Sequence, residues 1–315
     1  MSTNGQLPPY PLEGRDLAQV TREEIAEAVL TAPRVNPIEG GPSIALPPIP
    51  GDVPTSQIYP VLGPPPIARI SSSAVVKYGR HIQLCEARNL QWVAENTCIQ
   101  VPKVIDAWEA DNRTSTRGNT CYIVMEYIEG KLLSHIWPDL DLESRRSIQG
   151  KLAEYIHQLR SIEINVPGPI GGGVSAGSFF TGYGAGPFKS LQEMESWFNE
   201  RLQVCHIFGH APQLPPEWFT GRFSPLVMCH LDIDLRNLLL DDHGNLWLLD
   251  WAFSGAYPPY FENANIKWKT TSDLADGLLE MIETETYRED IDQLMAIGFA
   301  LTTGACTKPT IEDST

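Results

Sequence analysis

The second half of the chain carries a helical pattern of apolar residues. A helix is expected from about Leu142 to Ile162, where apolar side chains recur three or four positions apart. Similar faces predict helices over residues 191–204 and within 272–303. Near the N-terminus, Thr21–Glu24 is a capping-box sequence, so another helix should begin there. The apolar face of the first helix consists of Ile148, Leu152, Tyr155, Ile156 and Leu159.

Shorter apolar runs predict strands. The β-branched run at 74–79 and the run at 121–126 are typical of strands in the first half. Three short runs follow at 228–230, 238–240 and 246–249, and the polar DDHGN sequence between the last two predicts a hairpin turn. This order of elements predicts an α+β chain with two lobes, a small β-rich one and a larger, mainly helical one.

The length of 315 residues fits two lobes with a terminal extension. We expect residues 1–66 to form the extension, 67–128 the small lobe and 129–315 the large lobe. Residues 1–15 are polar and are expected to be disordered, and dense prolines from Pro33 to Pro66 exclude regular structure. The proline-rich segment is either a loose tail or an arm that covers the small lobe or a neighbouring subunit.

The charge of the chain excludes two kinds of partner. Asp and Glu number 39 against 23 Lys and Arg, which gives a net charge of -16 and an isoelectric point near 4.8. Without a basic cluster, this surface repels nucleic acid and anionic membranes. The six cysteines lack metal-ligand spacing, the N-terminus lacks the apolar core of a signal peptide, and no apolar run reaches the ~18 residues of a membrane span. A cytoplasmic protein is expected, and its oligomeric state stays open.

One polar motif lies among the short strands of the second half. His230, Asp232 and Asn237 form an H-x-D-x-x-x-x-N pattern, and Asp250 ends the strand at 246–249. Phosphoryl transfer needs a carboxylate that orients the attacking hydroxyl and oxygen ligands for Mg²⁺. Asp232 suits the first task, while Asn237 and Asp250 suit the second if the hairpin brings them together. Because Asp and Asn also favour turns for local reasons, the combination carries the inference.

The neighbours of this motif have separate interpretations. His230 is expected to be a hydrogen-bonded strut, and a nucleophile at Cys229 with His230 as its base is disfavoured because neighbours on an extended segment point to opposite faces. Asp234 would repel the transferred group unless a metal or the substrate offsets its charge. Asp234 could instead face a cationic substrate, turn outward, or form an ion pair with Arg236. We expect the ion pair.

The motif resembles the catalytic loop and metal-binding Asp of the aminoglycoside phosphotransferase family. In the fungal-type branch the second Asp begins a D-W-x-x-x-G-x-Y-P run, and this chain has Asp250-Trp251, Gly255, Tyr257 and Pro258 at those positions. The resemblance implies a protein-kinase-like fold, ATP and Mg²⁺ as cofactors, and a small-molecule acceptor. It also implies a nucleotide-binding lobe at residues 67–128.

That lobe holds candidates for the nucleotide site. Lys77 lies in the run at 74–79, and Glu86 follows nine residues later in a stretch with helical spacing. In kinase-like folds, a strand lysine paired with a helix glutamate binds the α- and β-phosphates. By resemblance, Met125 lies beside the adenine, and the backbone of Glu126 to Ile128 hydrogen-bonds the base. The alternatives are an exposed lysine at a strand end and a solvated glutamate on a helix.

Two loops raise further questions. Kinase-like sites usually cover the phosphates with a glycine-rich loop, but the residues before Lys77 read ARISSSAVVK. Its serine amides either cap a phosphate or only form a tight hairpin. The glycine-rich segment at 166–187 lacks the strand and helix that flank a phosphate cradle, and the resemblance puts it near the acceptor. Its Phe179, Phe180 and Tyr183 either line a substrate pocket or pack beneath the loop.

Three acids are candidates for contacts with a cationic acceptor. Residues 257–262 are expected to form a rigid turn on the acceptor side, and Glu262 ends it. Asp273 and Glu280 follow in the next helical stretch. Exposure to solvent is the favoured interpretation for all three, because Asp and Glu side chains are mostly solvated.

Together these features predict an ATP-dependent phosphotransferase that moves the γ-phosphate to a hydroxyl of a small molecule. Asp232 would accept or orient the hydroxyl proton. One alternative is a kinase-like protein that binds a ligand or acts as a scaffold without transferring phosphate. Another is the same fold used for other chemistry on a metabolite. The missing glycine loop and Asp234 favour the first alternative, and the complete set of candidate residues opposes it.

Overall fold

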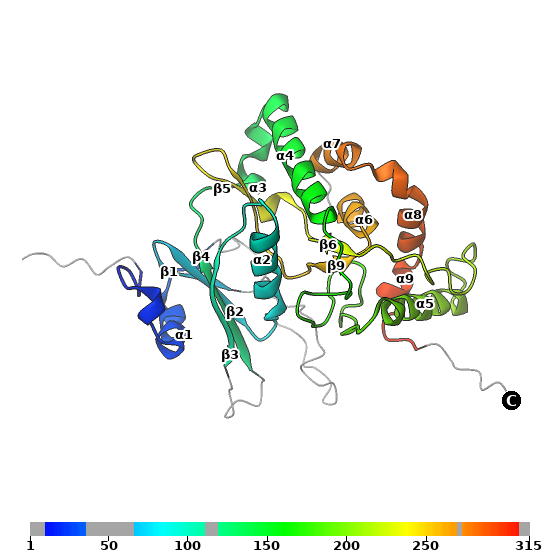
Figure 1. Cartoon of the computed structure of the whole chain (residues 1–315), viewed down its shortest axis with the longest axis horizontal. Helices are drawn as coiled ribbons and strands as arrows, with labels where there is room; N and C mark the ends of the chain where they lie inside the picture. Colours follow the sequence, from blue (N-terminus) through cyan, green and yellow to red (C-terminus); the bar gives the residue numbers. More distant parts are fainter. Residues whose placement is uncertain (1–9, 36–65, 111–118, 270–272, 309–315) are drawn as a thin grey trace, which may run out of the picture. The chain divides into compact units, whose positions relative to one another are not determined.

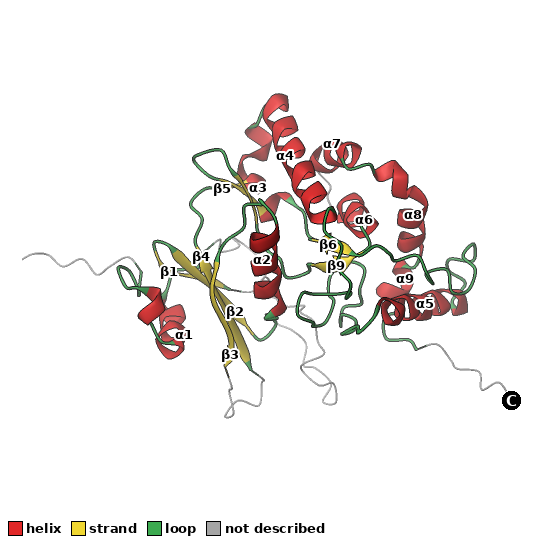
Figure 2. Cartoon of the chain, viewed as in Figure 1, coloured by secondary structure: helices red, strands yellow, loops and turns green. Residues whose placement is uncertain are grey.

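The chain divides into two compact units in the computed structural model (Figure 1). The sheet unit comprises the residues up to Ala87 together with Pro102–Glu129, and the helical unit comprises Arg88–Val101 and everything from Gly130 onward. Strands dominate the first and helices the second (Figure 2). This confirms the α+β class. The structure describes residues 10–35, 66–110, 119–269 and 273–308.

An antiparallel sheet in the order β1-β2-β4-β3 forms the core of the sheet unit. Its side chains alternate between two faces. Val76 and Val124 pack with α1 (Arg22–Thr31), whereas Ile123 on the other face packs with the start of α2 (Cys85–Asn96). The strands are β1 (Ile67–Ser71), β2 (Ala74–Gly79), β3 (Val104–Ala110) and β4 (Thr120–Glu126).

The predicted capping box opens α1. Glu24 N–H donates to Thr21 Oγ1 at 3.2 Å, and Thr21 N–H donates to the Glu24 carboxylate at 2.9 Å. The two residues thereby satisfy each other's backbone N–H groups: that of Glu24 in the first turn and that of Thr21 at the N-cap. The buried side chains of α1 are Ile25, Ala28 and Val29.

The extension lies on the sheet unit wherever it is described. Leu12 is buried, and its N–H donates to Ile70 O at 2.9 Å. Disorder was therefore the wrong expectation for residues 10–15. Arg34, in the proline-rich segment, forms an antiparallel bridge with Ala68, so the start of this segment covers β1 as an arm would. Residues 1–9 and 36–65, on which the other expectations rest, lie outside the described residues.

Helices surround one apolar core in the helical unit. The predicted long helix is confirmed as α4 (Leu142–Arg160), with its expected face buried, and α5 (Leu191–Ile207) is confirmed as well. The helical region predicted from 272 to 303 is interrupted, with residue 272 outside the described part. It forms α7 (Asp273–Met281), η5 (Thr284–Tyr287), α8 (Arg288–Ala296) and α9 (Gly298–Leu301). The remaining helical segments are η1 (Leu17–Gln19), α3 (Leu133–Ile136), η3 (Trp137–Asp139), η4 (Leu235–Asn237) and α6 (Tyr260–Lys269).

Short antiparallel strands of the helical unit carry the polar motif. β7 (Leu238–Leu240) lies between β5 (Lys131–Leu132) and β8 (Leu246–Leu248). β6 (Val227–Cys229) pairs with β9 (Gly255–Tyr257) and starts one residue earlier than predicted. Among the described helices, none combines the length and apolar character that a membrane crossing requires.

Candidate active site

The β7–β8 hairpin aligns the two ends of the polar motif. Leu238 pairs with Leu248, and Leu249 N–H donates to Asn237 O at 2.8 Å. Asp250 follows directly, so the hairpin brings its backbone next to Asn237. This arrangement is the one expected from the turn sequence between the strands.

Asp232 is nearly buried, and both of its carboxylate oxygens are engaged. Asn237 Nδ2 donates to Asp232 Oδ2 at 2.9 Å and to Asp232 O at 2.8 Å. Arg236 donates to Oδ1 at 2.7 Å, and Lys269 Nζ contacts the same oxygen. The side chain is 5% exposed. One amide and two cations therefore fix the orientation of this carboxylate.

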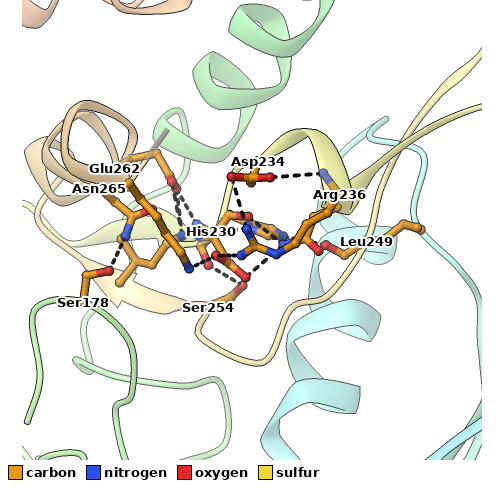
Figure 3. Close-up of polar contacts among 12 residues, drawn as sticks. Ser178, His230, Asp234, Arg236, Leu249, Ser254, Glu262 and Asn265 are labelled. Atoms are coloured by element: carbon orange, nitrogen blue, oxygen red, sulfur yellow. Dashed lines mark hydrogen bonds and ion pairs between the residues drawn. The ribbon is translucent and has the colours of Figure 1, made fainter. Parts of the chain in front are cut away.

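Arg236 forms the predicted ion pair with Asp234, at 3.1 Å (Figure 3). Because it also contacts Asp232, one guanidinium links two carboxylates. Burial opposes the charge of Arg236, but these carboxylates outweigh it and raise its pKa. Asp234 additionally caps η4 by accepting Arg236 N–H at 3.2 Å. The repulsion expected from Asp234 is thus offset within the loop itself.

His230 makes the hydrogen bonds expected of a strut. Its ring Nε2 lies 3.0 Å from Leu249 O, and its Nδ1 accepts Asp232 N–H at 3.2 Å (Figure 3). Burial lowers the pKa of His230 to about 4, which keeps the ring neutral near pH 7. Ser254 Oγ donates to His230 O at 3.1 Å. The ring connects the strand that leads to Asp250 with the backbone of Asp232.

Glu262 was predicted to be an exposed acid at the end of a turn, and that prediction is wrong. It is 2% exposed, lies in the first turn of α6, and accepts the N–H groups of His230 and Leu231, the second at 3.1 Å (Figure 3). Leu231 has a φ of 58°, an uncommon conformation for this residue type. Glu262 therefore holds a strained backbone immediately before Asp232. Burial raises the pKa of Glu262 to about 7.

Asn89 is a second residue that the sequence did not reveal. Its Nδ2 donates to Trp251 O at 3.1 Å and to Ser254 O at 2.8 Å. These carbonyls lie just after Asp250, whose φ of 61° is in the left-handed region. A fully buried amide thus anchors the turn that carries Asp250. The available signal was a polar residue one turn before the apolar Val93 on the buried face of α2.

In the sheet unit, Lys77 and Glu86 form the expected ion pair. Lys77 Nζ donates to Glu86 Oε1 at 2.7 Å, and the two side chains are 5% and 3% exposed. Lys77 is therefore not an exposed lysine at a strand end, and Glu86 is not a solvated glutamate on its helix. Since removing a lysine and a glutamate from water costs several kcal/mol, their burial together needs this pairing.

The segment expected to bind adenine follows β4 in the same unit. Met125 is buried in the sheet's apolar core. Glu126 N–H donates to Lys103 O at 2.9 Å, and Tyr127 N–H donates to Ser73 O at 2.8 Å. Among the described residues, Ile128 N–H has no hydrogen-bond partner. Of the three N–H groups expected to serve a base, only this one is available in the present conformation.

The serine-rich turn before Lys77 is a tight hairpin. Ser71 pairs with Ala74, and the amide of Ser72 is already occupied, because Ser72 N–H and Oγ donate to Glu13 at 2.6 and 2.7 Å. Of the two alternatives for this turn, the structure favours the simple hairpin.

The aromatic residues of the glycine-rich segment mostly pack in the core. Phe179 and Phe180 are buried against α5 and α6, so a pocket-lining role is wrong for both. Tyr183 is 46% exposed. Asp273 and Glu280 are exposed but carry partners: Asp273 contacts Arg145 at 2.6 Å, and Glu280 lies 3.6 Å from Arg146.

Asn237 and Asp250 offer the hard oxygen donors that Mg²⁺ prefers. Both N–H bonds of the Asn237 amide point to Asp232, and no hydrogen bond within the described residues engages its carbonyl oxygen. That oxygen suits a cation. The described residues hold no group of three or more His, Cys, Asp or Glu that would form a protein-only site. The side-chain oxygens of Asn237 and Asp250 would suit a Mg²⁺ ion whose other ligands are substrate phosphates.

A Glu262→Gln variant should change the pH dependence of stability. The raised pKa of Glu262 contributes stability at low pH that is lost as pH rises from about 4.5 to about 7. The lowered pKa of His230 acts oppositely, since stability is lost as pH falls from 6.5 to about 4. In the variant only the His230 effect remains, so its free energy of unfolding should fall more steeply between pH 6.5 and 4.5.

Urea denaturation at a series of pH values measures this difference. Glu280→Gln is the matched control, because Glu280 is an exposed acid of the same unit, and its curve should parallel that of the wild type. A parallel curve for Glu262→Gln would contradict the assignment.

The small antiparallel sheet unit and the helical unit that presents Asp232, Asn237 and Asp250 have the α+β arrangement expected from the sequence. The model of the phosphotransferase enzyme family matches residues 83–296, more than half of the chain. The chain therefore belongs to this family. The resemblance inferred from the motif is confirmed.

Three solved structures to which the chain is similar are a phosphotransferase complex, a choline kinase and a macrolide phosphotransferase. APH(2")-IIia in complex with GDP and kanamycin is 11% identical, with 75% of this chain and 82% of that chain covered at a TM-score of 0.49. Choline kinase LicA from Streptococcus pneumoniae is 18% identical, with coverages of 78% and 82% and a TM-score of 0.42. Macrolide 2'-phosphotransferase MphH from Brachybacterium faecium is 15% identical, with coverages of 78% and 86% and a TM-score of 0.43. Among curated proteins, none matches the chain.

Proposed function

We propose that the protein transfers the γ-phosphate of ATP to a hydroxyl group of a small molecule. Asp232 accepts the hydroxyl proton while the acceptor oxygen bonds to phosphorus and the bond from phosphorus to the ADP oxygen breaks. Asn237 and Asp250 hold Mg²⁺, which neutralises phosphate charge when bound. The observation that carries this proposal is the position of Asn237. Its side chain donates to Asp232, and its backbone carbonyl accepts the N–H of Leu249, the residue before Asp250.

The nucleotide contacts belong to the sheet unit in this proposal. Lys77, oriented by Glu86, binds the α- and β-phosphates, and the buried ion pair at 2.7 Å supports that role. Met125 lies beside the adenine, and the backbone from Glu126 to Ile128 binds the base through Ile128 N–H and the carbonyl groups. The N–H groups of Glu126 and Tyr127 already have partners.

Thermal unfolding with and without ATP and Mg²⁺ tests the proposal. A ligand at 100 times its dissociation constant that binds only the folded state adds about 2.7 kcal/mol of stability. We expect this increment in the wild type and its loss in Asp250→Ala, because a ligand of the metal is removed. Each protein is compared with itself, so a change in its intrinsic stability does not enter the result.

Asp242→Ala is the control, since Asp242 is an exposed acid in the nearby hairpin turn and should retain the increment. An unchanged increment in Asp250→Ala would refute the metal assignment. No increment in the wild type would refute ATP-dependent transfer and favour a kinase-like protein that binds another ligand.

A further inference from the structure

Lys269 reaches Asp232 from a distant part of the chain. It is the last residue of α6, and its ammonium group contacts Asp232 Oδ1. The lysine side chain is 29% exposed, and its Nζ lies 5.5 Å from the ring centre of Phe253. Asn265, one turn earlier on the same helix face, donates to Ser178 Oγ at 3.1 Å (Figure 3). The end of α6 therefore contacts the proposed base through Lys269.

The ammonium of Lys269 occupies an oxygen that an acceptor hydroxyl needs. A hydroxyl that gives its proton to Asp232 must approach within about 2.6–3.2 Å of a carboxylate oxygen. Oδ2 is held by Asn237, and Oδ1 is held by both Arg236 and Lys269. Acceptor binding must therefore displace one of these donors.

Lys269 is the donor that is easiest to displace. Arg236 is fixed at two points, because it pairs with Asp234 as well as Asp232. Asn237 is fixed by two hydrogen bonds to Asp232 and by its place in η4. Lys269 makes one ion pair within the described residues, and its flexible side chain can turn while α6 stays in place.

We propose that the acceptor carries an anionic group, a carboxylate or a phosphate, that draws Lys269 away from Asp232. The inference rests on the proposed phosphotransfer and names the class of its acceptor. The anion replaces Asp232 as the counter-charge of Lys269, and Oδ1 becomes available to the acceptor's hydroxyl. Binding of the correct compound and release of the base are then one event.

The four acids that were candidates for contacts with a cationic acceptor all have other partners. Glu262 is buried and bonded to backbone amides, and Asp234 is paired with Arg236. Asp273 and Glu280 have arginine partners. A polyamine would instead meet Lys269, a like charge, next to the hydroxyl that is to react.

The first test measures ATP hydrolysis without any acceptor. Water needs no anionic group, so Lys269→Met should raise hydrolysis several-fold by freeing Oδ1. Lys267→Met is the matched control, because Lys267 lies on the same helix, is exposed and pairs with Asp292 at 3.5 Å. It should hydrolyse ATP at the wild-type rate. Lower hydrolysis and a higher KM for ATP in Lys269→Met would overturn the proposal and assign Lys269 to the γ-phosphate.

The second test compares D-gluconate, D-sorbitol and D-glucamine, which share a hydroxylated six-carbon chain and end in an anion, a neutral group and a cation. Thermal shift and phosphate transfer should both favour gluconate in the wild type. In Lys269→Met the preference for gluconate over sorbitol, measured as the ratio of their kcat/KM values, should fall about tenfold, the effect of one charge-assisted hydrogen bond. Turnover of sorbitol should rise as hydrolysis does, because Oδ1 is free. Lys267→Met should keep the preference.

The outcomes separate this inference from the proposed function. Stabilisation by ATP and Mg²⁺ without a preference for gluconate would overturn the anionic acceptor alone. A preference for sorbitol or glucamine would do the same. Absence of ATP stabilisation and of hydrolysis would remove the proposed phosphotransfer, and the inference with it.

Discussion

Asp232→Asn is expected to lower turnover by about 10²–10⁴-fold, the usual contribution of a general base. Asparagine keeps the shape of the side chain, but its amide cannot take up the proton of the acceptor hydroxyl. The hydrogen bond from Asn237 and the neighbouring strands should persist, so nucleotide binding should change little. ATP consumption with a metabolite panel and thermal shift with ATP and Mg²⁺ measure the two effects separately.

The control for this variant is Asp242→Asn, the same substitution at an exposed acid in the adjoining hairpin, which should keep wild-type turnover. Because Asp232→Asn also releases Lys269 and Arg236 from an ion pair, its folding is checked by urea denaturation. A folded Asp232→Asn protein with unchanged turnover would show that another group accepts the proton.

Local sequence predicted the parts of the site that local structure builds. The β7–β8 hairpin follows from two apolar runs and a polar turn, and its register places Asp250 beside Asn237. The ion pair of Arg236 with Asp234 joins residues two positions apart in one turn. Such features need no knowledge of the rest of the fold.

The supports of the site come from distant parts of the chain and were missed. Glu262 lies 32 residues from His230, and Lys269 lies 37 residues from Asp232. Asn89 is 162 residues from Trp251. In sequence each is an ordinary polar residue of a helix, and solvation is the usual state of such residues. Only packing of the helix against the loop gives them a role.

The sequence leaves two interpretations of the serine-rich turn open, a phosphate cap and a tight hairpin. The place of the ARISSSAVVK segment before Lys77 makes it a candidate for a phosphate-binding loop. The segment is a tight hairpin, and Glu13, 59 residues away, binds the amide of Ser72. A residue of the extension thus decides which groups of this turn remain available, and no pattern within the segment records it.

A Lys77→Met variant should be the least stable of the substitutions considered, and it should also lose ATP binding. Removing one partner from a buried ion pair costs about 3–5 kcal/mol, because the other charge stays buried. The side chains of Lys77 and Glu86 are 5% and 3% exposed, so they form a buried ion pair of this kind. Urea denaturation should show the loss, and thermal shift with ATP and Mg²⁺ should show the missing ligand increment.

The double variant Lys77→Met/Glu86→Leu separates the two roles of the pair. Replacement of a buried ion pair by apolar residues of similar size is often neutral or stabilising, so most of the lost stability should return. ATP stabilisation should stay absent, because the positive charge for the phosphates is still missing. Recovery of both stability and ATP binding would mean that Lys77 only neutralises Glu86. If Lys77 binds phosphate, stability should recover but ATP binding should not. Folding needs no charge at these two buried positions, whereas the nucleotide needs the positive charge of Lys77.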